Sequence, residues 1–262
     1  MNSLRLLYTF FRVNLLNETA YRVNFFVQLF QALLELGTSL AGLAVIFAYT
    51  KTLGGWRPDE MLALVGVYFL VGGLISLVIQ PSMAALIDSV RDGTLDFMLT
   101  KPEDAQLLVS IQRMAIIWSL LDMLMGMGVL GTALVRLGKT IGAGQAAAFI
   151  GMLVAGGVIV YSFWLILASL SFWFVRVENL LEIFQSMYQA GRWPVSLYPG
   201  WLRFGLTFIV PVAFAVSVPA EALTGRLDAP TLLGAVGLAV LLAGVARLVW
   251  RLGLRRYSGA SA

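Results

Sequence analysis

Long runs of apolar residues alternate with short polar connections along the whole chain. Crossing the hydrocarbon core of a bilayer takes about 20 apolar residues in a helix, so runs of this length predict transmembrane spans. The pattern predicts an all-α membrane protein with six transmembrane helices and connections too short to hold a soluble domain. The expected spans cover approximately residues 25–49, 61–79, 114–134, 146–174, 204–218 and 231–250.

The fifth apolar run, residues 204–218, differs from the others because it is short and contains Pro211. A proline inside a helix removes a backbone hydrogen bond and kinks or ends the helix. This run is therefore expected to be either a kinked span that begins near Pro199 or a re-entrant segment.

Basic residues predict the orientation of these spans. Positively charged loops stay on the cytoplasmic side of a membrane. With both termini cytoplasmic and six spans, thirteen of the 18 basic residues fall inside, while the outside keeps Lys51, Arg57, Arg136, Lys139 and Arg226. Five spans would place the arginine-rich C-terminal segment outside, so the charge distribution favours six spans with the N- and C-termini inside.

The N-terminal segment, residues 1–22, precedes the first span and contains the stretch LRLLYTFFRVNLL. Arg5, Thr9 and Arg12 recur at helical spacing among apolar residues, which is typical of an amphipathic helix lying on a membrane surface. An extension of the first span is the alternative, but it would bury two arginines in the bilayer at considerable cost.

Polar residues within the expected spans are candidates for a transport pathway. Gln28, Gln31 and Glu35 are spaced by three and four residues, so they lie on one face of the first span. Asp122 lies in the third span. Carboxylates inside a membrane are costly and face protein or water. These side chains either line a pathway or make packing contacts between helices, and a carboxyl group in the second case could be protonated.

Small residues also cluster in three spans and allow helix backbones to approach closely. The clusters are Gly72 and Gly73; Gly126, Gly128 and Gly131; and Gly151, Ala155, Gly156 and Gly157. Packing within the chain is the favoured interpretation, and a dimer interface is the alternative.

The connection after the fourth span predicts an amphipathic helix. Leu180, Leu181, Phe184, Met187 and Tyr188 form an apolar stripe, and Gly191 and Pro194 end the pattern. Such a helix is expected either to lie on the membrane surface or to face a partner protein.

Composition limits the chemistry that the chain can perform. The chain is 60% hydrophobic and only 12% charged, and it contains neither histidine nor cysteine. Without these residues we find no nucleophile–base pair and no metal-ligand cluster, so we expect no enzymatic activity, no metal and no cofactor in this chain. The net charge of +4 is assigned to cytoplasmic loops, so no nucleic-acid partner is expected.

The most charged stretch, RDGTLDFMLTKPEDAQ at residues 91–106, lies between the second and third spans. A helix is expected to continue from the second span and to break at Gly93, and Pro102 prevents a second helix from continuing. Leu95, Phe97, Met98 and Leu99 make the segment too apolar for a solvated loop. It is expected to lie on the inner leaflet or to insert side chains into a groove on a soluble partner.

This stretch resembles the signature (R/E)-x-G-T-L-(D/E)-x-L-L-x-x-P of permeases in the type-two ATP-binding cassette (ABC) exporter family. The N-terminal segment, the six spans and the short outer loops are similar to that family too. The stretches GRWP and RRYSGASA look like those of a bacterial subgroup of uncharacterised permease components. One departure is that Pro219–Pro230 leaves little room for the re-entrant hairpin that many members carry between their last two spans.

The resemblance implies a cytoplasmic coupling helix that docks on a separate ATPase. Leu95, Phe97 and Leu99 would fill its groove, and Gly93 would supply the turn. The residues implied in coupling are Arg91, Gly93, Thr94, Leu95, Asp96, Phe97, Leu99, Lys101 and Pro102.

The resemblance also implies the partners and the location. The partners would be a soluble ABC ATPase that binds ATP and magnesium, a second permease chain that is identical or homologous, and the lipid bilayer. The chain would be a single permease domain, residues 1–262, in the bacterial inner membrane, and it would work in export. The alternative function is a secondary transporter driven by protons or sodium, with Glu35 and Asp122 as coupling sites.

Overall fold

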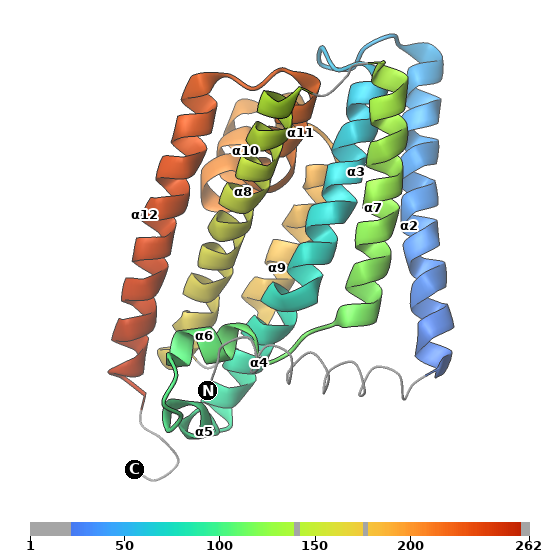
Figure 1. Ribbon diagram of the computed structural model, residues 1–262. Coiled ribbons are helices and arrows are strands. Elements are labelled where there is room, and N and C mark those ends of the chain that lie inside the picture. The colour runs from blue at the N-terminus through green and yellow to red at the C-terminus, as the bar shows by residue number, and fades with distance from the viewer. Residues whose placement is uncertain (1–21, 139–141, 175–177, 258–262) are drawn as a thin grey trace.

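The computed structural model describes residues 22–138, 142–174 and 178–257. These residues form a helical bundle (Figure 1). The longer helices are α2 (Arg22–Tyr49), α3 (Pro58–Leu74), α4 (Gln80–Arg91), α7 (Ile116–Leu137), α8 (Ala143–Ser169), α9 (Glu178–Tyr188) and α12 (Ala229–Leu254). The shorter ones are η1 (Ile75–Ile79), α5 (Asp96–Leu99), α6 (Ala105–Ser110), η2 (Leu170–Phe172), η3 (Gln189–Arg192), η4 (Val195–Leu197), α10 (Gly200–Phe204), η5 (Gly205–Ile209), η6 (Ala213–Ser217) and α11 (Val218–Thr224).

Within the described residues, five helical segments are long and apolar enough to cross a membrane. They are Phe26–Tyr49, Pro58–Arg91, Ile116–Leu137, Ala143–Phe172 and Ala229–Leu254. A bent pair, Gly200–Ile209 and Ala213–Thr224, raises the number to six if it counts as one span. The chain is thus an all-helical, multi-pass membrane protein. The expected interfacial helix lies outside the described residues, except for Arg22, which begins α2.

The second span is longer than a bilayer requires. Helices α3, η1 and α4 run without a break over 34 residues, which is about 50 Å of α-helix. The hydrocarbon core is about 30 Å thick, so the rod is roughly 20 Å longer than the core. The helix ends at Arg91, and Asp92 and then Gly93 follow, so the break lies where the sequence predicts it. Helices α5 and α6 follow at this end of the bundle, where α12 also ends (Figure 1).

The fifth apolar run is not a straight helix. The segments Gly200–Ile209 and Ala213–Thr224 meet at an angle of 78°. Pro211 lies in the break, and Val210 before it is extended, as expected for a residue that precedes proline. The bent pair therefore occupies residues that we had partly assigned to a span, and it lies beside the start of α12 (Figure 1). The bend fits both expected alternatives for this run, a kinked span that begins near Pro199 and a re-entrant segment.

Glycines bring α3 and α7 into backbone contact. A Cβ on Gly126 would lie 2.5 Å from the backbone nitrogen of Leu70, and one on Gly66 would lie 2.7 Å from that of Leu130. A Cβ on Gly73 would lie 2.8 Å from the carbonyl oxygen of Ser119. Gly73 and Gly126 therefore pack within the chain, as favoured from the sequence, and Gly66, which lies outside the predicted clusters, does the same. The predicted residues Gly128, Gly131, Gly151 and Gly157, by contrast, have open space where a Cβ would be.

Helix α9 enters the bundle instead of lying outside it. The side chains of Leu181, Phe184 and Tyr188 are buried. The ring of Phe184 lies 4.9 Å from that of Trp164 on α8, edge to face, and Tyr188 stacks on Tyr68 of α3 at 5.0 Å. The apolar stripe is correctly predicted, but its partner is the chain's own core. This corrects the expectation of a surface or partner-facing helix.

Candidate functional site

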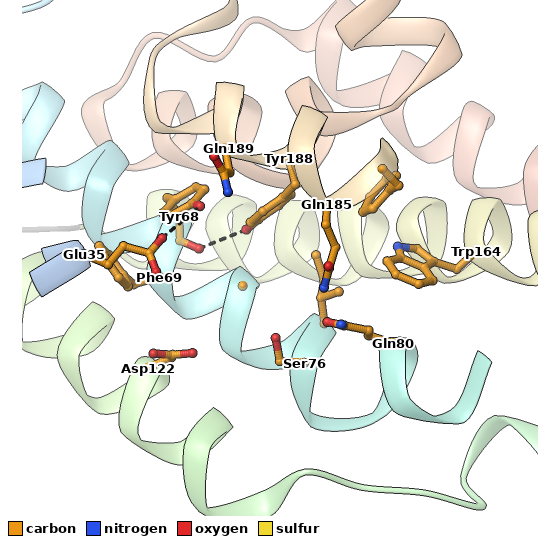
Figure 2. A pocket seen from close by; sticks show the side chains of 13 residues that line it. Glu35, Tyr68, Phe69, Ser76, Gln80, Asp122, Trp164, Gln185, Tyr188 and Gln189 are labelled. Carbon is orange, nitrogen blue, oxygen red and sulfur yellow. Dashed lines mark hydrogen bonds between the residues drawn. The ribbon is translucent and has the colours of Figure 1, made fainter. Parts of the chain in front are cut away.

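A cavity of about 260 Å³ opens between α2, α3, α7, α8 and α9 (Figure 2). Its walls combine aromatic rings with polar groups from segments far apart in the sequence. The lining residues are Glu35, Tyr68, Phe69, Gly72, Ile75, Ser76, Gln80, Asp122, Trp164, Phe184, Gln185, Tyr188 and Gln189. Glu35 and Asp122, which the sequence singled out separately, thus line one cavity.

Glu35 is held by an ion pair with Arg192, whose guanidinium donates to the carboxylate. The hydroxyl of Tyr68 donates to the same carboxylate oxygen at 3.4 Å. The guanidinium of Arg192 also lies over the Tyr68 ring, 5.4 Å from its centre. The charge of Glu35 is therefore compensated within the chain. The sequence alone does not reveal this role, because Arg192 counts there among the basic residues expected in the cytoplasm.

Two tyrosines stabilise this wall of the cavity. The hydroxyl of Tyr188 donates to the carbonyl oxygen of Tyr68 at 2.9 Å, and Tyr188 is buried. This bond ties α9 to α3 across 120 residues of sequence. The sequence assigned Tyr188 to an apolar stripe, and periodicity alone does not reveal that its hydroxyl reaches a backbone carbonyl.

Asp122 is half-buried on α7 and faces the same cavity (Figure 2). Its carboxylate makes no hydrogen bond or ion pair with any residue that the structure describes. The other two members of the predicted polar face, Gln28 and Gln31, do not line the cavity, and Gln31 is exposed. The structure therefore brings together Glu35 and Asp122 and leaves both glutamines out.

Helix α5, at the end of the α3–α4 rod, presents an apolar side chain to the outside. Phe97 is 74% exposed, and Leu99 is also exposed. Leu95, in contrast, is fully buried against its own bundle. It is not available to fill a groove on another protein, which corrects the role expected for it. Its spacing of two from Phe97 places the two side chains on opposite sides of the short helix.

Gly93 makes the turn between α4 and α5. Its φ of +68° is in the left-handed region, which favours glycine. The amides of Thr94 and Leu95 then both donate to the carbonyl oxygen of Ser89, at 2.9 and 3.2 Å. These bonds satisfy the C-terminal end of α4 and fix the direction of α5.

The charged residues around this turn are at the surface. Arg91 pairs with Asp88 at 3.1 Å and with Asp92 at 3.2 Å. Lys101 and Pro102 are exposed, as is Thr94, and Asp96 is half-buried in the first turn of α5. The flanking charges expected around the docking segment are therefore accessible apart from the partly covered Asp96.

Helix α6 links this end of the bundle to α8 and α12. Asp104 caps α6 by accepting bonds from the amides of Gln106 and Leu107. The guanidinium of Arg247 on α12 donates to both carboxylate oxygens of Asp104, at 3.1 and 2.5 Å, and to Gln106 at 2.5 Å. This bond to Arg247 lowers the pKa of Asp104 from its ordinary value, although Asp104 is largely exposed. Gln106 also donates to the hydroxyl of Tyr161 on α8 at 3.1 Å.

Comparison with known protein families identifies the chain. Residues 33–261 match the family described as ABC-2 family transporter protein, and the chain therefore belongs to this family. It is a membrane-embedded permease component of the ABC transporter class. Neither the curated proteins nor the solved structures yielded a match.

Proposed function

We propose that this chain is one half of the permease of an ATP-driven exporter, that residues 1–262 form a single permease domain, and that α5 docks on a separate ATPase. The observation that carries the proposal is the 74% exposure of Phe97 on a short helix at the end of a 34-residue rod. A large exposed aromatic side chain flanked by charges is typical of an anchor at a protein interface.

The connections of α5 explain how movement there could reach the membrane. The α3–α4 rod carries α5 at one end and the cavity residues Tyr68 and Gly72 further along. The bonds from Asp104 and Gln106 to Arg247 and Tyr161 join the same end to α12 and α8. A rigid-body displacement of the docking segment would therefore move three long helices together.

The remaining parts of the transporter follow from this assignment. ATP and magnesium would bind to the ATPase, and Leu99, Arg91, Asp96 and Lys101 would surround Phe97 in the contact. A second permease chain, identical or homologous, would complete the pathway in the bilayer of a bacterial inner membrane. Glu35 and Asp122 would contribute to the substrate path from the cavity.

The position of Glu35 and Asp122 in one cavity also keeps the alternative, a proton- or sodium-driven secondary transporter, in consideration. The pairing of Glu35 with Arg192 argues against it, because this carboxylate already has a cationic partner within the chain, whose place a transported proton or sodium ion would have to take. Transport by the purified chain alone, driven by a proton or sodium gradient without an ATPase, would favour the alternative.

The docking assignment is tested by Phe97→Asp, with Val135→Asp as the matched control. Both positions are exposed and apolar, at 74% and 81%, but Val135 lies at the opposite end of the bundle. We expect Phe97→Asp to reduce co-purification with a co-expressed ABC ATPase that the native chain retains by at least about tenfold, corresponding to about 1.4 kcal/mol. Val135→Asp should leave it unchanged. Equal recovery of the ATPase with both variants and the native chain would contradict docking through α5.

A further inference from the structure

Several polar side chains that line the cavity between α2, α3, α7, α8 and α9 have no protein partner. The carboxylate of Asp122 and the side-chain amides of Gln80, Gln185 and Gln189 make no hydrogen bond with any described residue. Gln185 and Gln189 are exposed, so they lie where the cavity opens. Groups of this kind are normally paired with protein, water or a ligand.

A fully buried tryptophan supplies an independent indication of a ligand. Trp164 lines the cavity with no exposed surface, and its indole nitrogen has no partner among the described residues. Figure 2 shows this nitrogen on the side of the ring that faces Gln185. A buried N–H without an acceptor costs about 1–3 kcal/mol, so a hydrogen-bond acceptor in the cavity would stabilise it.

The charged side chains of the cavity indicate the sign of the charge that a ligand would carry. Glu35 is neutralised by Arg192, whereas Asp122 has no cation beside it. A positive partner stabilises a half-buried carboxylate, because it offsets the hydration that the carboxylate has lost. A ligand that balances the charges of this cavity therefore carries one positive charge.

The aromatic walls select the chemical type of the cation. Tyr68, Phe69, Trp164, Phe184 and Tyr188 all line the cavity. Ring faces attract organic ammonium groups, which are weakly hydrated and make cation–π contacts. Described residues contain no cluster of three or more acidic side chains suited to a metal ion. A volume of about 260 Å³ fits a small cation, since the pockets that bind drug-sized ligands measure roughly 300–1,000 Å³.

We propose that this cavity binds a small organic monocation of the ammonium class that carries a hydrogen-bond acceptor. Asp122 compensates the charge, the rings contact the ammonium group and the Trp164 N–H donates to the acceptor. This inference names the substrate class for the pathway assigned to the chain, so it rests on the proposed function.

Choline and 3,3-dimethyl-1-butanol provide a test, because they have the same shape and differ in the positive charge. Binding of tritiated choline to the full-length chain in a maltoside detergent, free of phosphocholine lipids, is measured by scintillation proximity. We expect saturable binding that unlabelled choline displaces at least about tenfold more effectively than the neutral analogue does. Equal displacement by the analogue, or by sodium chloride at the same concentration, would overturn the proposal.

Two variants assign the binding to this cavity. Asp122→Asn keeps the shape and should weaken choline binding at least about tenfold, whereas Glu182→Gln, on an exposed face of α9, should leave it unchanged. Trp164→Phe should weaken choline about threefold and leave tetramethylammonium, which has no hydroxyl, unaffected. Full choline binding by folded Asp122→Asn protein would overturn the proposal, as would an absence of binding by the native chain.

The outcome is separable from that of the proposed function. Choline binding requires no ATPase, and Phe97→Asp should not change it, because α5 lies at the end of the rod and away from the cavity. A chain that binds its ATPase but not choline would retain the exporter assignment and lose this inference. A chain that binds choline but not the ATPase would retain the cation site and lose the exporter assignment.

Discussion

At each end of the bundle an arginine forms an ion pair with a carboxylate from another segment, but the two carboxylates differ in how far they are buried. At the end opposite α5, Arg226 pairs with Glu60 at 3.7 Å and lies over the ring of Trp56 at 4.8 Å. The side chain of Glu60 is only 7% exposed. At the α5 end, Arg247 pairs with Asp104, whose side chain is 47% exposed.

This difference in burial indicates at which end separating the ion pair costs more free energy. Glu60 is a buried carboxylate that also accepts a bond from the backbone amide of Arg57 at 2.9 Å, so opening its cluster leaves a buried charge without partners. Water can replace Arg247 at Asp104, because the two side chains are 36% and 47% exposed. Breaking the ion pair at the α5 end therefore costs less free energy, which suits an end that would move when a partner protein docks on it.

The largest effect should come from Glu60→Ala. The change removes the common partner of Arg57 and Arg226, and we expect a loss of about 2 kcal/mol in the free energy of unfolding. Thermal unfolding of the purified chain measures it, with Asp59→Ala as the control, because Asp59 is a half-buried neighbour in the same turn that makes no ion pair in the described chain. Equal melting temperatures for the two variants would show that the buried cluster contributes nothing special.

A smaller effect is expected from Arg247→Ala. It breaks the two bonds to Asp104 and the bond to Gln106, but solvent screens these groups, so the loss should be about 0.5–1 kcal/mol. The matched control is Arg251→Ala, one turn further along α12, whose side chain is exposed and makes no ion pair in the described chain. A destabilisation as large as that of Glu60→Ala would remove the contrast between the two ends.

The smallest effect concerns pH. The bond to Arg247 holds the pKa of folded Asp104 below its ordinary value of 3.8. The stabilisation is therefore complete above the unfolded pKa and is lost as the pH falls through the lower, folded pKa. The difference in melting temperature between the native chain and Arg247→Ala should be constant near neutral pH and shrink below about pH 4. A difference that grows on acidification would contradict this sign.

Much of the fold was accessible from the sequence because bilayer spans depend on local composition. The apolar runs that predicted the first, second, third, fourth and sixth spans correspond to α2, α3–α4, α7, α8 and α12. The turn at Gly93 was also predicted, since a helix followed by glycine is a local signal. The fifth run was harder, because Pro211 divides it and composition alone does not give the angle between its halves.

The candidate site was only partly accessible. Glu35 and Asp122 stood out as carboxylates in apolar runs, but Arg192 and Trp164 resembled an ordinary loop cation and an ordinary core aromatic. Leu95 and Phe97 looked equivalent in the docking stretch, and only packing separated the buried side chain from the exposed one.

By itself the sequence determined that this chain crosses a membrane several times, where α4 stops, and which residues are unusual for an apolar environment. Each of these depends on neighbours within a few turns of helix. The tertiary structure alone decided that α9 enters the bundle, that Arg192 neutralises Glu35 and that Asp122 remains without a cation. Those outcomes depend on contacts between residues 33 to 157 positions apart, as in the bonds of Glu35 to Tyr68 and Arg192, which no local pattern encodes.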